Sequence, residues 1–427
     1  MRCLHCDSND WENVDEFRLT PKDMCICKKC GFVSFPKQWK SEEEIKQHYR
    51  KDYRNPPTAN NFFTSHRKVH FHAAFLDDLF KQWEKEERKE PEICEIGAAY
   101  GVALNWFKHY YPGAKVSGTE LTTSYRKNAW HEFKIELTED FDDSKKYDLI
   151  MSYKVAEHIL DVDRHLRKYA ECLKDNGVLY ISVPIWFGPM TNFGVQGFDL
   201  DYYYDPNHIN VWTKKIFENL LKKAGLEIIK KDHVMYDSTY LCKRNDEKMM
   251  EEISFENVEE IKDRMKRIKK AYEHFKKSEY DEAISIYPNF PVAHTSRAEM
   301  ARKQIHENGW QWCLDNVINK AIKDCPESAE VMIAATDLSL RFEKYKEAIK
   351  YCETALKMKP ENATSLIQMI NIMRQMALKD EEGNPSSKEA NIHYMTQARD
   401  IARHLRAVSP GHLKESLDLI YLFNAKL

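Results

Sequence analysis

The sequence predicts an α/β fold with a mostly parallel sheet, preceded by a small cysteine-rich unit and followed by an all-α region. Three observations lead to this prediction. Two C-x-x-C pairs lie within the first thirty residues, short apolar segments then alternate with helical ones, and strand signals stop beyond about residue 250. At roughly 100 to 200 residues per domain, 427 residues allow two or three domains. We place them at residues 1–38, 39–245 and 246–427.

The cysteine-rich unit carries Cys3-x-x-Cys6 and, after twenty intervening residues, Cys27-x-x-Cys30. Two such pairs at this separation let four thiolates converge on a tetrahedral zinc ion, the arrangement of a zinc ribbon. Two separate redox pairs or disulfides are the alternative. Cys25 lies on the same strand face as Cys27, and we interpret it as packing rather than as a fifth ligand. So small a unit has little core, and the metal is expected to supply most of its folding energy.

The middle of the chain alternates between strands and helices. The predicted strands are Glu92–Ile96, Lys115–Glu120, Lys134–Leu137, Tyr147–Tyr153 and Val178–Val183, with an antiparallel pair at Leu226–Tyr236 and Ser238–Cys242. The predicted helices are Glu42–Tyr49, His66–Glu87, Ala99–Tyr110, Val162–Cys172 and Thr213–Ala224. Short apolar strands that alternate with helices are typical of a mostly parallel sheet covered on both faces.

Two glycines follow the first of these strands directly. The whole chain has only 13 glycines, so Gly97 and Gly101 at this place are informative. Glycines after a parallel strand let the backbone turn tightly and approach a ligand at the carboxyl edge of the sheet, next to a helix N-terminus. The spacing of these two glycines differs from the G-x-G-x-x-G motif, which argues against a dinucleotide cofactor.

The stretch Glu95-Ile96-Gly97-x-x-x-Gly101 resembles the first motif of class I methyltransferases, which bind S-adenosylmethionine on a Rossmann-like seven-stranded sheet. Glu120 closes the next strand, where that family carries an acid for the ribose hydroxyls. Further stretches similar to the family follow in the family's order: Tyr147–Tyr153 with Glu157-His158, Leu173–Leu179, and Asp205–Asn210 with Trp212-Thr213 and Ala224–Leu226. The last of these resembles the subgroup that often modifies sugars and small metabolites. The resemblance covers about residues 40 to 245.

The resemblance implies that S-adenosylmethionine is the cofactor and that its pocket lies at the ends of these strands. Glu95 is expected to meet the amino end of the methionine moiety or to hold the loop, and Glu120 the ribose. Thr138 precedes the fourth strand and is expected to contact the amino group of the adenine. The other implied contacts are Gly97, Ala98, Gly101, Leu121 and Tyr153. Asp148 is interpreted as structural.

His158 and His208 are the candidate catalytic residues. Methyl transfer is an in-line displacement that depends on positioning, and a base is needed only where the acceptor must lose a proton. Imidazole titrates near neutrality, although each histidine could instead be a hydrogen-bonded wall residue. An aromatic group (Trp186, Phe187, Tyr202, Tyr203 and Tyr204) could form a stacking platform for a sugar, with core packing or lid closure as the alternatives.

The C-terminal region has the pattern of amphipathic helices. Pro291, Pro326 and Pro360 are spaced by 35 and 34 residues, the period of tetratricopeptide helix pairs. Pro410 continues the series if Lys379–Lys388 is an inserted loop. An ordinary helical bundle is the alternative, but it does not explain the period. Repeats of this kind offer a concave surface to a peptide or a protein partner.

These features predict a methyltransferase that acts on a small-molecule or glycan acceptor, such as a sugar, a nucleotide-linked sugar or a surface-glycan intermediate. The alternatives are an RNA or protein methyltransferase that uses the zinc ribbon and repeats for substrate recognition, and a non-catalytic repeat scaffold. The formal net charge of −3 counts against a nucleic-acid partner. We find no apolar run that could span a bilayer and no signal peptide, which predicts a cytoplasmic protein.

Overall fold

The computed structural model describes residues 2–14, 24–34, 41–51, 75–185, 208–234, 237–247, 255–304, 307, 309–358, 362–379 and 383–408. These residues form two compact units, one up to Arg264 and the other from Met265. The first unit contains both the cysteine-rich segment and the large sheet, and the second is helical. The predicted division into three domains stays a prediction.

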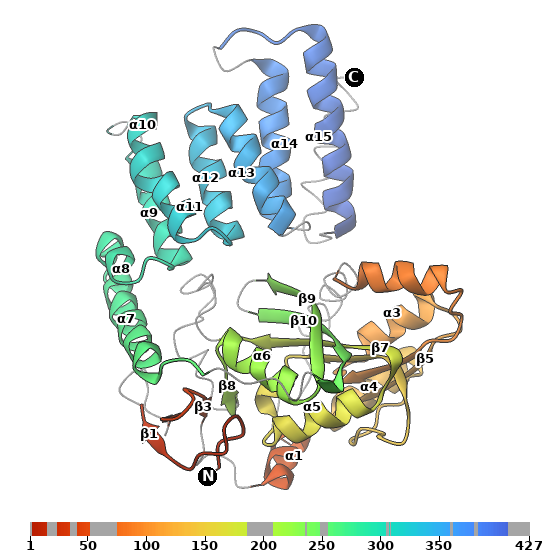
Figure 1. The fold of residues 1–427 in the computed structure, drawn as a ribbon. Coiled ribbons are helices and arrows are strands. Elements are labelled where there is room, and N and C mark those ends of the chain that lie inside the picture. Colours follow the sequence, from red (N-terminus) through yellow and green to blue (C-terminus); the bar gives the residue numbers. More distant parts are fainter. Residues whose placement is uncertain are drawn as a thin grey trace. The chain divides into compact units, whose positions relative to one another are not determined.

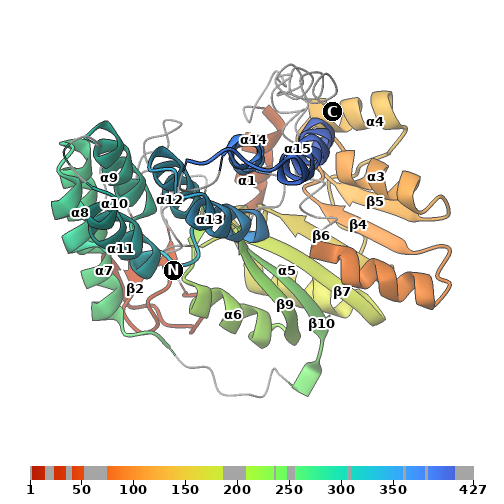
Figure 2. The same cartoon turned by 90° about the horizontal axis from the view of Figure 1, so that it is seen from above.

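The sheet of the first unit has the order β5-β4-β6-β7-β10-β9, and its strands can be followed in Figure 2. Its strands are β4 (Glu92–Ile96), β5 (Lys115–Thr119), β6 (Tyr147–Tyr153), β7 (Leu173–Pro184), β9 (Leu226–Val234) and β10 (Asp237–Arg244). The pairs among β4, β5, β6 and β7 are parallel, whereas β10 pairs antiparallel with both neighbours. This confirms a mixed α/β fold with a Rossmann-like sheet.

The seven-stranded sheet is not confirmed, because six strands are seen in the part of the chain that the structure describes. The predicted strand Lys134–Leu137 is irregular. Lys134 adopts a left-handed conformation that ends helix α4 (Thr123–Phe133), itself not predicted. Ile135 and Leu137 are buried in the core, and only Thr138 forms a parallel bridge, to Thr119. The segment thus packs like a strand but pairs with the sheet at one residue.

Helices cover both faces of the sheet because alternate strand residues point to opposite sides. Cys94, Ile150 and Leu179 share a cluster with residues of α5 (Val162–Glu171) and α6 (Lys214–Lys223). Their neighbours along the strands, such as Ile93 and Leu149, pack with α3 (Val102–Tyr110), α4 and helical residues 75–85. The short helix η2 (Ala156–His158) follows β6, and α1 (Glu42–Lys51) precedes the sheet in the sequence.

The cysteine-rich segment forms a small antiparallel sheet with the order β1-β2-β3-β8 (Figure 1). Its strands are β1 (Trp11–Asn13), β2 (Cys25–Cys27), β3 (Val33–Ser34) and β8 (Asn210–Val211). Strand β8 comes from the region just before α6. The cysteines Cys3, Cys27 and Cys30 belong to the same buried cluster as the α5 and α6 face of the large sheet. The segment therefore shares the core of the first unit.

The second unit is built from helices that pack in sequence order (Figure 1). They are α7 (Val258–Lys276, which begins in the first unit), α8 (Tyr280–Ile286), α9 (Pro291–Lys303), α10 (Trp310–Cys313), the π-helical turn η5 (Leu314–Ile318), α11 (Asn319–Asp324), α12 (Ala329–Arg341), α13 (Tyr345–Met358), α14 (Ala363–Leu378) and α15 (Lys388–Val408).

The ends of these helices follow familiar rules. Pro291 occupies the first turn of α9, where its missing N–H costs nothing. Ser328 caps α12 and Asn362 caps α14. In each case the side chain accepts a hydrogen bond from a backbone amide in the first turn of the helix. Among the described residues, no helix combines the length and hydropathy that crossing a membrane requires.

Candidate functional site

The register of the parallel strands brings the predicted cofactor residues to one edge of the sheet. Ile96 at the end of β4 pairs with Thr119 of β5 and Ser152 of β6. The segments that leave these strands, beginning at Gly97, Glu120 and Lys154, therefore lie next to each other. Ligands of open α/β sheets bind at this carboxyl edge.

The loop after β4 depends on its glycines. Gly97 and Gly101 have φ values of 66° and 71°, in the left-handed region that glycine tolerates best. A Cβ on Gly97 would lie 2.5 Å from Cγ2 of Val155, so the loop after β6 packs directly against this position. Ala99 also has a positive φ, of 46°. Sequence reasoning missed Ala99, since an alanine gives no sign of such a conformation.

Glu120 fastens this loop to the end of β5. Its carboxylate accepts the backbone amide of Ala99 at 2.9 Å and that of Thr122 at 2.7 Å. Burial raises the pKa of Glu120, and the two amides oppose that shift. Each carboxylate oxygen has further lone-pair capacity and can still accept a hydroxyl hydrogen bond. Glu120 can therefore hold the loop and bind ribose hydroxyls at the same time.

Glu95 is a buried acid at the end of β4. Its side chain is 8% exposed, and Oε2 has no hydrogen-bond partner. Burial, with a smaller effect of the Glu120 charge, raises the pKa of Glu95 to about 8. A buried carboxyl without a donor suits a ligand that brings a positive charge. The α-ammonium group of S-adenosylmethionine fits this requirement.

The remaining predicted cofactor residues lie at the same edge. Ala98 N donates to the Thr119 carbonyl at 2.8 Å, and Thr138 N donates to that of Gly118 at 3.0 Å. The Leu121 carbonyl accepts from Arg126 at 2.8 Å. Tyr153 is the last residue of β6. Asp148, by contrast, is structural as expected: Glu92 N, Arg88 and Lys174 all bind its carboxylate at the opposite end of the strand.

An ion-pair network beside this edge was not predicted. Glu139 binds Arg126 of α4 at 2.8 Å and Arg50 of α1 at 2.6 Å. Lys46 of α1 binds Asp140 at 2.6 Å. These pairs connect α1 to the segment that follows Thr138. Opposite charges far apart in a sequence give no signal of pairing, so only the structure reveals them.

His158 and His208 meet at the carboxyl edge, although they come from different parts of the chain. Their ring centroids lie 5.0 Å apart. His158 Nε2 lies 3.8 Å from an oxygen of the buried Glu157. Burial lowers the pKa of His208 well below 6.5, and the nearby His158 and Lys154 add to this shift. His208 is therefore neutral at pH 7.

The ligand atoms of Glu157, His158 and His208 all lie within 4.8 Å of one another. Two imidazoles and one carboxylate form a set that divalent cations also use. The cluster can thus work in proton transfer or hold a cation. The predicted aromatic platform at Trp186, Phe187, Tyr202, Tyr203 and Tyr204 lies outside the described residues.

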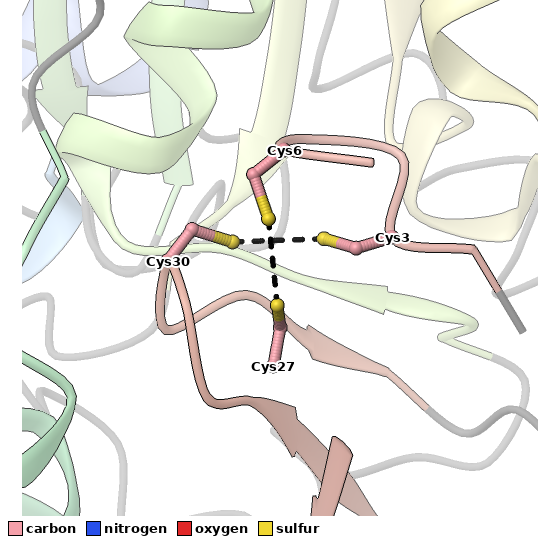
Figure 3. Close-up of side chains that lie close together, drawn as sticks. All are labelled: Cys3, Cys6, Cys27 and Cys30. Carbon is pink, nitrogen blue, oxygen red and sulfur yellow. Dashed lines mark hydrogen bonds between the residues drawn. The ribbon is translucent and has the colours of Figure 1, made fainter. Parts of the chain in front are cut away.

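The four predicted zinc ligands converge on one point (Figure 3). The Sγ atoms of Cys3 and Cys30 lie 3.6 Å apart, and those of Cys6 and Cys27 lie 3.5 Å apart. All four ligand atoms fall within 4.8 Å of one another, and none forms a disulfide. Zinc–sulfur bonds of about 2.3 Å in a tetrahedron require sulfurs roughly 3.8 Å apart. The cluster has the dimensions of a Cys₄ metal site.

The four thiols influence one another's pKa values because they lie so close together. The hydrogen bond to Cys27 raises the pKa of Cys3 to about 12, while the hydrogen bond from Cys3 lowers the pKa of Cys27. Deprotonation of one thiol therefore disfavours deprotonation of its neighbours. A bound metal removes these protons outright.

Comparison with known proteins supports the assignment of the large sheet. Residues 64–231 match a family described as a methyltransferase domain, and this range includes the glycine loop, Glu120 and both histidines. The ubiquinone biosynthesis O-methyltransferase of Pelagibacter ubique is 31% identical over 110 residues, which are 25% of this chain and 46% of that protein. The chain thus spans about half the length of this curated relative.

Solved structures with a similar fold include other methyltransferases. One from Clostridium acetobutylicum, dependent on S-adenosylmethionine, has 14% identity and a TM-score of 0.34, covering 44% of this chain and 100% of that one. The O-methyltransferase of a polyketide multienzyme from Brevibacillus brevis, in complex with S-adenosyl-L-homocysteine, has 12% identity and a TM-score of 0.29, covering 37% and 67%. From the family match, the chain contains a class I, S-adenosylmethionine-dependent methyltransferase domain.

Proposed function

We propose that this protein transfers a methyl group from S-adenosylmethionine to a hydroxyl of a sugar, a nucleotide-linked sugar or a surface-glycan intermediate. The observation that carries the reaction type is the meeting of His158 and His208 beside the cofactor loop. Val155 ties the two sites together, because it packs against Gly97 and stands just before η2, which contains His158. An oxygen acceptor is favoured by the similarity to an O-methyltransferase.

The chain's residues divide the work between donor and acceptor. S-adenosylmethionine, when bound, supplies a methyl group on a positively charged sulfur. Glu95 would pair with its ammonium group, and Glu120 would accept hydrogen bonds from its ribose hydroxyls. His158 takes the proton of the acceptor hydroxyl, and the buried Glu157 carboxylate stabilises the imidazolium that forms. With the cofactor held there, His158 would carry away the proton that the acceptor hydroxyl loses when it receives the methyl group.

The flanking regions serve the acceptor or a partner in this proposal. The Cys₄ cluster holds zinc, as its sulfur spacing supports. The helices α9 to α15 form tetratricopeptide-like repeats that bind a protein partner, supported by their packing in sequence order. The protein acts in the cytoplasm.

The cofactor assignment is tested by calorimetric titration. Wild-type protein should bind S-adenosylmethionine, and Glu120→Ala should weaken binding by at least tenfold, because it removes both the loop clamp and the ribose acceptor. Ser339→Ala is a matched control, since Ser339 is a buried hydroxyl of α12 in the second unit. Absence of binding, together with indifference to Glu120→Ala, would support the non-catalytic scaffold instead.

The acceptor class needs a transfer experiment. Protein is incubated with labelled donor and, in separate reactions, nucleotide sugars, extracted glycans, RNA or whole-cell protein. Label in the sugar or glycan fractions is the expected result. Label confined to RNA or protein would refute the glycan acceptor and favour a macromolecular substrate.

A further inference from the structure

We propose that the Cys₄ unit is a positioning element for the histidine pair. In this view Ser34 of β3 holds β8, the strand that begins just after His208, and thereby sets where His208 stands relative to His158. The inference rests on the proposed function in two respects: the metal held by the Cys₄ cluster and the role of the histidine pair in methyl transfer. It assigns to the metal unit a task in the acceptor site rather than in cofactor binding.

The first part of the argument is the contact between β3 and β8. The two strands pair antiparallel, with Ser34 opposite Asn210 and Val33 opposite Val211. The hydroxyl of Ser34 donates to the Ile209 carbonyl at 2.7 Å. Ser34 is 1% exposed, so this bond is shielded from water. A strand of only two residues has little stability of its own and depends on its partner strand.

The second part is the contact from β8 to the segment that carries His158. The side-chain amide of Asn210 donates to the Ile159 carbonyl at 2.6 Å. Asn210 is 2% exposed and comes two residues after His208, while Ile159 directly follows His158. Ser34 and Asn210 therefore connect the cysteine-rich sheet, the backbone after His208 and the turn of His158 in one buried chain of hydrogen bonds.

The third part links these contacts to the metal. Cys27 is the last residue of β2, and this strand pairs with β3 through Cys25 opposite Ser34. The amide of Cys27 also donates to the Phe32 carbonyl at 2.8 Å, which holds the turn of the second cysteine pair. Metal binding at Cys27 and Cys30 fixes the end of β2 and the turn that leads into β3, so it adds to the stability of this small sheet. Loss of the metal should therefore loosen β2 and β3, and with them β8.

Nuclear magnetic resonance on the full chain with ¹⁵N-labelled histidine tests this proposal. The ring signals of His158 and His208 are assigned through His158→Gln and His208→Gln. Removing the metal with a chelator should shift both signals, and so should Ser34→Ala in metal-loaded protein. Affinity for S-adenosylmethionine should stay within about threefold in both cases. Ser34→Thr retains the hydroxyl and should restore most of the wild-type spectrum.

Ser339→Ala is the matched control for Ser34→Ala. Its buried hydroxyl donates to the Ala335 carbonyl at 2.8 Å in the second unit, so both substitutions remove a similar hydrogen bond. It should leave the two histidine signals in place. The proposal is overturned if metal removal and Ser34→Ala leave those signals unmoved, or if freshly purified protein carries no metal. It is also overturned if cofactor affinity falls more than tenfold alongside the shifts, because that result indicates general unfolding.

The outcome is separable from that of the proposed function. Wild-type protein that fails to bind S-adenosylmethionine would contradict the methyltransferase proposal. The histidine signals would still report whether the cysteine-rich unit positions the pair, because they require neither cofactor nor acceptor.

Discussion

The imidazole rings of His158 and His208 lie 5.0 Å apart between centroids, in an edge-to-face arrangement, at the carboxyl edge of the sheet. One ring belongs to the short helix after β6, and the other stands two residues before β8. Burial lowers the pKa of His208, which disfavours proton uptake by that ring and leaves His158 as the candidate proton acceptor. The buried Glu157 carboxylate lies 3.8 Å from His158 Nε2, which makes His158 the preferred base.

His158→Gln should therefore lower the rate of methyl transfer by roughly 10² to 10⁴, the usual contribution of a general base. His208→Gln should cost less, since that residue supports the base. Affinity for S-adenosylmethionine should change by no more than about twofold in either variant, because neither histidine belongs to the glycine loop. Rates are measured with labelled donor and affinities by calorimetry. A His158→Gln enzyme with more than a third of the wild-type rate would contradict this assignment.

Metal analysis separates the two clusters of ligand side chains. Freshly purified protein should contain about one equivalent of zinc, held by Cys3, Cys6, Cys27 and Cys30. Cys30→Ser should remove it and lower the melting temperature, because the metal supplies folding energy to the unit. Cys352→Ser, a buried thiol of α13, is the matched control and should leave the zinc content unchanged. A second equivalent that disappears in His208→Gln would assign a cation to the histidine cluster instead of a proton-transfer role.

Cofactor affinity should depend on pH through Glu95. In the free protein its pKa is about 8, so at pH 6 to 7 the carboxyl is mostly protonated. An ammonium group binds the ionised form of Glu95. At a pH below the raised pKa, binding must therefore release the proton of the Glu95 carboxyl. Affinity should rise from pH 6 to about 7.5 and then level off, because α-amino groups lose their own proton at about pH 8.

Calorimetry across this pH range provides the measurement, with buffers of different ionisation enthalpy to count the released protons. Glu95→Gln removes the titrating group, so its affinity should be lower at pH 7.5 and almost independent of pH between 6 and 7.5. An equal pH slope in wild type and Glu95→Gln would show that another group is responsible. Glu136→Gln, an exposed acid in the first unit, is the control.

The sequence allowed the sheet and the cofactor edge to be predicted because both depend on local patterns. Apolar strands, the glycine pair at Gly97 and Gly101, and the acid Glu120 each follow a rule of spacing within one motif. The convergence of the four cysteines was predictable for the same reason. The prediction of a strand at 134–137 was wrong. Ile135 and Leu137 are buried, and buried residues give the same apolar pattern whether or not the backbone pairs with a neighbouring strand.

Other parts of the site depend on contacts between distant segments, and no local pattern announces them. The bond from Ser34 to the Ile209 carbonyl is one example, and the ion pair of Arg50 with Glu139 is another. The proximity of His158 and His208 was also beyond prediction, although each was chosen as a candidate. They lie 50 residues apart in the sequence, and no local pattern signals that their rings meet.

The packing of Val155 against Gly97 gives a prediction about stability. An alanine at Gly97 would adopt a left-handed backbone, at a cost of about 1–2 kcal/mol, and its Cβ would lie 2.5 Å from Val155 Cγ2. Overpacking of this kind typically adds about 1–3 kcal/mol. Gly97→Ala should therefore lower the free energy of unfolding by about 2–5 kcal/mol, measured by chemical denaturation.

The double variant distinguishes the two causes. Val155→Ala removes the clashing methyl group but leaves the left-handed backbone, so it should recover part of the loss in Gly97→Ala, with a coupling of about 1–2 kcal/mol. Gly309→Ala is the control, because a Cβ there meets no atom within 4 Å and its φ of −71° suits any residue. Strict additivity of Gly97→Ala and Val155→Ala would mean that the cost comes from the backbone alone. In that case the loop after β6 would not restrain the cofactor loop, and the link between the donor site and His158 would be lost.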